Sequence, residues 1–81
     1  MNRYVRITIE EEDERETVEL RVVSETASWL VGQEISSRGI PEGRYRRVES
    51  VGDERVIDRR TIIAQTELRY DPLYRTLRPV A

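Results

Sequence analysis

The side chains of this chain that could do chemistry are carboxylates and arginines. Two carboxylates in different environments can act as a general acid and a general base, and Asp53, Glu54 and Asp58 are the group to consider for this role. A polar turn on an 81-residue domain offers little room for the desolvated pocket that such pKa shifts require. The chain has no histidine and no cysteine, so the usual general base and thiol nucleophile are also missing. We therefore expect no catalytic residue, no cofactor and no enzyme.

A run of acidic residues, EEEDE at positions 10–14, is the candidate for a cation site. Hard metal ions prefer carboxylate oxygens as ligands. The run lacks the spacing and the central glycine of a calcium-binding loop. The sequence therefore predicts a solvated hairpin tip here, and no metal site.

The arginines raise the question of nucleic-acid binding. All 14 basic residues are arginine, but the net charge is -2 and the pI is about 5.2. Phosphate binding needs a net basic surface, and residues 38–60 carry five acids beside seven arginines. We interpret the region as a salt-bridged strand face and keep nucleic-acid binding as the alternative function from another class. The arginines that motivate it are Arg44, Arg46, Arg47, Arg55, Arg59 and Arg60.

Charge is divided unevenly along the chain. Residues 1–37 hold four arginines and nine acids, whereas residues 38–81 hold ten arginines and seven acids. Opposite charges on the two halves would favour a head-to-tail contact between copies, which builds rings or filaments. Self-association therefore stays open.

Hydrophobic periodicity predicts the elements that position these side chains. Residues 4–10 and 17–23 alternate apolar and polar side chains, which predicts two strands of a hairpin. Residues 24–39 carry apolar side chains at helical spacing, with Ser24 or Thr26 as the cap, which predicts a helix. Trp29 lies off its apolar stripe and either packs at the helix edge or contacts a partner. Short strands are expected at 44–48, 55–57, 61–64 and 73–80.

No segment is apolar enough to span a membrane or to serve as a signal peptide, so a cytoplasmic protein without membrane contact is expected. At 81 residues, the chain is expected to form a single domain over 1–81, with 73–81 as its C-terminal strand and tail.

Two segments resemble the ubiquitin family. GIPEGRYRR, at 39–47, resembles the loop and third strand of ubiquitin, and VGDERVIDRRTI, at 51–62, resembles the turn and short strand that follow. The resemblance implies an α+β ubiquitin-like β-grasp fold over the chain: a β-hairpin, one main helix and a mixed sheet of four to five strands. LVGQEISSRGIPEGRYRRV, with the later LYRTLRP, is similar to bacterial ubiquitin-like proteins encoded with E1-like, E2-like and JAB-type peptidase partners.

This resemblance implies a protein modifier or interaction module, conjugated through Ala81 by E1-like and E2-like partner enzymes. The chain ends in RTLRPVA and not in the Gly-Gly of most modifiers, which leaves open a noncovalent adaptor or a subunit of a larger assembly such as a type VII secretion apparatus. The residues expected to bind protein partners under either reading are Arg46, Val48, Arg75, Leu77 and Arg78.

Overall fold

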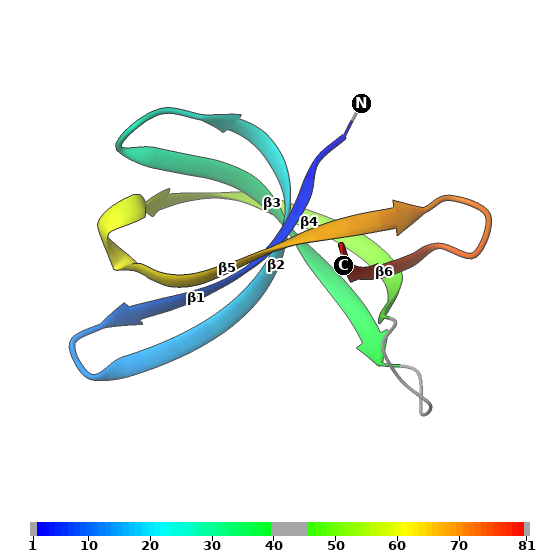
Figure 1. Ribbon diagram of the computed structural model, residues 1–81, viewed down its shortest axis with the longest axis horizontal. Helices are drawn as coiled ribbons and strands as arrows, with labels where there is room; N and C mark the ends of the chain where they lie inside the picture. Colours follow the sequence, from blue (N-terminus) through cyan, green and yellow to red (C-terminus); the bar gives the residue numbers. More distant parts are fainter. Residues whose placement is uncertain (1, 40–45, 81) are drawn as a thin grey trace.

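The chain folds into antiparallel β-strands (Figure 1). The computed structural model describes the backbone of residues 2–39 and 46–80 and the side chains of residues 2–35 and 51–80. The elements are β1 (Tyr4–Glu11), β2 (Glu14–Glu25), β3 (Trp29–Gly39), β4 (Arg46–Asp58), the 3-10 helix η1 (Arg59–Thr61), β5 (Ile62–Asp71) and β6 (Thr76–Pro79).

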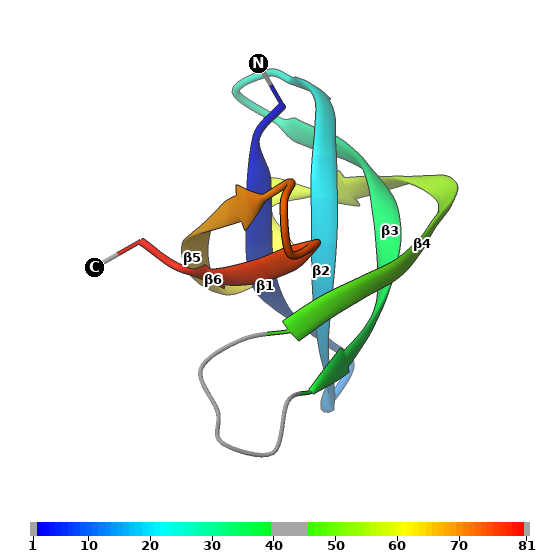
Figure 2. The same ribbon diagram turned by 90° about the vertical axis from the view of Figure 1, so that its right-hand side faces the viewer.

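The expected α+β β-grasp fold is wrong, because the described residues contain no α-helix and every strand pair is antiparallel. The strands form a closed barrel in the order β1-β2-β3-β4-β6-β5, and β5 pairs with β1 to close it. Figure 2 shows β1, β2 and β3 side by side, with β6 passing in front of β1. β6 pairs with the first residues of β4. The N-terminal hairpin of β1 and β2 is confirmed.

The segment predicted to be the helix forms the end of β2 and the whole of β3. Thr26 does accept backbone N–H groups, from Ser28 at 3.2 Å and Trp29 at 3.0 Å, but it does so in the turn between β2 and β3. Leu30 and Ile35 are both buried. Their spacing of five places them on opposite faces of a strand, where each meets a different part of the core.

Among the residues whose side chains are described, the buried hydrophobic ones form two clusters. Tyr4 and Val5 are adjacent on β1, and each is buried in a different cluster. Because successive residues of a strand point to opposite faces, the start of β1 is covered on both sides. The first cluster contains Val5, Ile7, Ile9, Val18, Leu20, Leu30 and Ile57. The second contains Tyr4, Ile35, Leu68 and Leu77, with Tyr70 packed against it.

This arrangement places two hairpins at opposite ends of the molecule. The β1–β2 hairpin and the β5–β6 hairpin project at the two ends of the long axis in Figure 1, in a molecule that measures 35 × 28 × 25 Å. Within the described part of the chain, no helix is long and apolar enough to cross a membrane.

Candidate functional site

The tip of the β5–β6 hairpin exposes two large apolar side chains. Leu73 and Tyr74 are 77% and 65% exposed, and they lie next to Arg75 in the loop that joins the strands. Single exposed apolar residues are common on protein surfaces, but two neighbours at a projecting turn are a concentrated apolar contact. We call Leu73, Tyr74 and Arg75 the hairpin tip.

The backbone of the hairpin tip is held in place by one carboxylate. Asp71 Oδ1 accepts the N–H groups of Leu73 at 2.9 Å and Tyr74 at 3.4 Å, which is the local hydrogen bonding by which aspartate stabilises turns. Arg75 then reverses the chain with a φ of 55°, and Asp71 pairs with Thr76 to begin the hairpin. The exposed side chains are therefore presented on an ordered turn.

The charge around the hairpin tip is positive. Arg69 and Arg78 lie opposite each other on β5 and β6, and residues 68–80 contain three arginines and one acid. Like charges placed directly opposite each other on a sheet destabilise it. Acidic groups on a partner would complement the net positive charge of residues 68–80.

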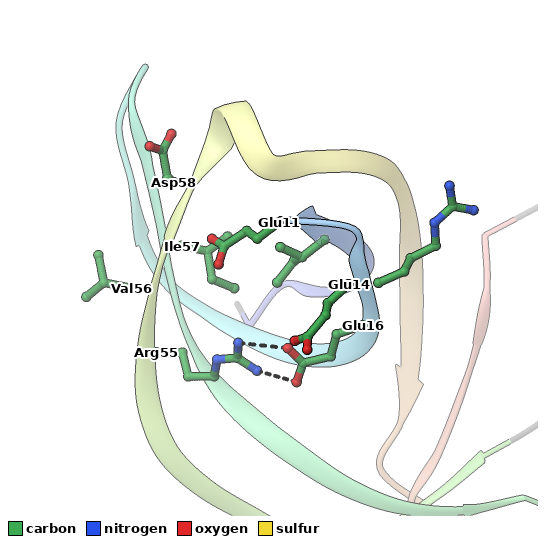
Figure 3. A pocket seen from close by; sticks show the side chains of 9 residues that line it. Glu11, Glu14, Glu16, Arg55, Val56, Ile57 and Asp58 are labelled. Atoms are coloured by element: carbon green, nitrogen blue, oxygen red, sulfur yellow. Dashed lines mark hydrogen bonds and ion pairs between the residues drawn. The ribbon is translucent and has the colours of Figure 1, made fainter.

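A pocket of about 260 Å³ lies at the other end of the molecule, between the β1–β2 hairpin and the C-terminal part of β4 (Figure 3). In Figure 3 the side chains of Glu11, Glu14 and Glu16 extend toward the hollow, whereas Val56 points away from it. Buried Ile9 and Ile57 give it an apolar floor. We call it the acidic pocket; it is lined by Ile9, Glu11, Glu14, Arg15, Glu16, Arg55, Val56, Ile57 and Asp58.

The arginines of the acidic pocket are already engaged by carboxylates. Arg55 donates two hydrogen bonds to Glu16, Nη1 to Oε1 at 2.9 Å and Nη2 to Oε2 at 3.1 Å, and these bonds lower the pKa of Glu16 below its ordinary value. Arg15 pairs with Glu10 at 2.7 Å. Within the described part of the chain, Glu11 and Glu14 form no ion pair. The pocket therefore keeps an excess of negative charge.

Two features limit the chemistry of the acidic pocket. Small-molecule sites typically enclose about 300–1,000 Å³, so a hollow of about 260 Å³ suits one side chain better than a substrate. No group of three or more acidic side chains among the described residues is placed to hold a metal ion. The acid run at 10–14 forms the turn of the β1–β2 hairpin and the strand ends beside it, as the sequence predicts.

The three carboxylates considered as a general acid and a general base have different surroundings. Asp58 accepts the backbone N–H of Arg60 at 2.9 Å as the cap of η1. Its pKa is lowered chiefly by the side-chain hydrogen bonds from Arg60. Asp53 and Glu54 are exposed on β4. No hydrogen bond joins these three side chains to one another.

The predicted partner-binding residues differ in their exposure to solvent. Arg75 and Arg78 are exposed on or beside the hairpin tip. Leu77 is 0% exposed in the second cluster, so the prediction that it contacts a partner does not fit its position. The backbones of Arg46 and Val48 belong to β4, but their side chains and all of Ala81 lie outside the described residues.

Sequence reasoning missed Leu73 and Tyr74. The available signal was the Asp71-Pro72 pair, which indicates a turn, followed directly by two large apolar residues where turns are usually polar.

Comparisons with known proteins identify no relative of this chain. No family model, no curated protein and no solved structure matches it.

Proposed function

We propose that this chain is a noncovalent protein-binding module that engages its partner with the hairpin tip. The observation that carries the proposal is the exposure of Leu73 and Tyr74, at 77% and 65%, on a turn held by Asp71. Burying a large apolar side chain contributes about 1.5–3 kcal/mol. An ordered turn loses little conformational freedom when it binds.

The residue types fit this role. Tyrosine and arginine are enriched among the residues that dominate binding energy at protein interfaces. At the hairpin tip they stand side by side as Tyr74 and Arg75, so an apolar socket with an acidic rim is the partner surface that matches them.

Two other functions have less support. Conjugation through Ala81 by E1-like and E2-like enzymes rested on the ubiquitin resemblance, and the fold that this resemblance implied is wrong. Nucleic-acid binding needs arginines that are available to phosphates, but many described arginines are engaged by carboxylates. These are Arg3, Arg6, Arg15, Arg55, Arg59 and Arg60.

The test is partner capture from a lysate of the source organism with tagged full-length protein. The variant Leu73→Ser/Tyr74→Ser should lose at least about tenfold in bound partner, since two interface anchors of more than about 1 kcal/mol each are removed. The matched control is Val23→Ser/Ile63→Ser, which alters two apolar residues that are each 50% exposed elsewhere. Equal capture by the tip variant and the wild type, with both folded by circular dichroism, would refute the proposal.

A further inference from the structure

We infer that the partner of the hairpin tip is a second copy of this chain, so that the tip of one copy docks in the acidic pocket of the next. The inference rests on the proposed function and names its partner. One chain carries both a protruding surface and a hollow that match in charge and polarity.

Charge complementarity is the first argument. Residues 68–80, which include the hairpin tip, hold three arginines and one acid, whereas the described residues that line the acidic pocket include four carboxylates and two arginines. Bringing Arg75 of one copy to Glu11 and Glu14 of another would add a cation to a lining in which carboxylates outnumber arginines. Complementary potentials of this kind select a partner and speed encounter.

Shape and polarity are the second argument. The acidic pocket has an apolar floor at Ile9 and Ile57 below a carboxylate rim, and its volume is about 260 Å³. The hairpin tip offers an aromatic ring with a guanidinium beside it. The ring of Tyr74 would reach the floor while Arg75 stays at the rim, which leaves neither a buried charge nor an exposed ring.

The placement of the two surfaces sets the form of assembly. The hairpin tip and the β1–β2 hairpin that borders the acidic pocket lie at opposite ends of the long axis (Figure 1). A contact between two different surfaces of the same molecule is heterologous, and it continues from copy to copy unless a rotation closes a ring. We therefore expect chains of copies whose length grows with concentration.

The contact is small, so the association should be weak and sensitive to salt. Interfaces below about 1,200 Å² belong to weak or transient complexes, and exposed charge pairs are screened within about 3 Å at 1 M salt. Sedimentation of the full chain up to about 1 mM is the suitable measurement. The weight-average mass should rise with concentration and fall toward the monomer at high salt.

Three variants localise the contact. Leu73→Ser/Tyr74→Ser removes the tip, and Glu11→Gln/Glu14→Gln removes charge from the pocket rim; each should weaken association at least about tenfold. Glu12→Gln/Asp13→Asn removes the same number of charges from the adjacent turn and should leave association near that of the wild type. Equal effects of the two charge variants would mean that net charge, and not the acidic pocket, drives assembly, and would overturn the inference.

Mixing the variants gives the decisive result. The tip variant keeps an intact pocket and the pocket variant keeps an intact tip, so together they should form a one-to-one dimer that grows no further. A wild-type mass that levels off at the dimer would overturn the open head-to-tail arrangement. A wild type that stays monomeric up to about 1 mM, while the tip variant still loses its partners in capture, would refute self-docking and leave the proposed function standing.

Discussion

Single arginine side chains tie together strands that are far apart in sequence. Arg3 contacts Glu67 of β5 and Glu25 at the end of β2, and Arg59 contacts the same Glu25 and the carbonyl of Thr26 at 2.8 Å. Exposed ion pairs each contribute about 0–1 kcal/mol. These contacts therefore fix how the strand ends meet more than they stabilise the barrel.

Gly32 is required where β3 passes β2. A Cβ at this position would lie 2.9 Å from Leu20 Cβ and 3.1 Å from the carbonyl oxygen of Arg21. Because Leu20 is fully buried, it cannot move aside freely. We expect Gly32→Ala to lower the free energy of unfolding by about 1–3 kcal/mol, as overpacking does, measured by urea denaturation.

Gly52→Ala is the matched control for this change. Among the described residues, its Cβ would meet one close atom, the carbonyl oxygen of Glu34 at 3.2 Å, so a smaller loss of stability is expected. If both substitutions lowered the free energy of unfolding equally, the general effect of alanine on a strand, and not the contact with Leu20, would be the cause.

Among the elements, the β1–β2 hairpin has an unfavourable turn. Glu12 and Asp13 adopt φ values of 47° and 68°, a conformation for which Asn-Gly is the preferred pair. Glu11 and Glu14 are also paired directly across the strands, and like charges in that position destabilise a hairpin. This acidic end of the molecule is therefore kept at some expense of stability.

We expect Glu12→Asn/Asp13→Gly to raise the free energy of unfolding by about 1 kcal/mol, because both residues accept positive φ. Urea denaturation measures the change. The comparison is Glu12→Gln/Asp13→Asn, which removes the same two charges and keeps a side chain at both positions. An equal gain in the comparison variant would show that charge repulsion, and not backbone strain, is what the first variant relieves.

The hairpin of β1 and β2 was predictable because its alternation is unbroken, whereas β3 was not. Leu30, Val31 and Ile35 also satisfy helical spacing. What decides for a strand is pairing on both sides, with β2 and with β4, and two cores that bury Leu30 and Ile35 on opposite faces. This is tertiary context, which overrides local propensity. The resemblance of residues 39–47 and 51–62 to ubiquitin implied the wrong fold for the same reason, because short segments carry no tertiary context.

The candidate site was predictable only in its charged residues. Arg75 was identified from the sequence, but the exposure of Leu73 and Tyr74 depends on how Asp71 folds the turn back on itself. The acidic pocket joins β1, β2 and β4, and only the closed barrel brings these strands together. Composition alone could indicate opposite charge in the two halves, but not where each surface lies.

At the scale of the whole molecule, the pH response of stability follows from the types of side chain present. The chain contains no histidine and no cysteine, so no side chain has an ordinary pKa between about 5 and 8. Hydrogen bonds from Arg55 and Arg3 lower the pKa values of Glu16 and Glu67 in the folded state.

The free energy of unfolding should therefore stay constant within about 1 kcal/mol between about pH 5.5 and 8, and fall below about pH 4.5. A carboxyl group whose folded pKa is lowered binds fewer protons when folded than when unfolded. Its contribution is present above the unfolded pKa and is lost as the pH falls through the folded pKa. Urea denaturation at a series of pH values measures this profile.

The variant Arg3→Met/Arg55→Met distinguishes the contribution of Glu16 and Glu67 to acid-induced unfolding from that of the remaining acids. Without the guanidinium groups, the pKa values of Glu16 and Glu67 should return toward their ordinary values. The change removes four ion pairs between described residues at the surface, two made by Arg3 and two made by Arg55. Stability above about pH 5.5 should then fall by at most about 4 kcal/mol, since such pairs each contribute about 0–1 kcal/mol. The acid-induced loss should shrink by the same amount, because the folded and unfolded chains now bind protons alike at these positions. An unchanged acid slope in the variant would assign the acid sensitivity to other carboxyl groups.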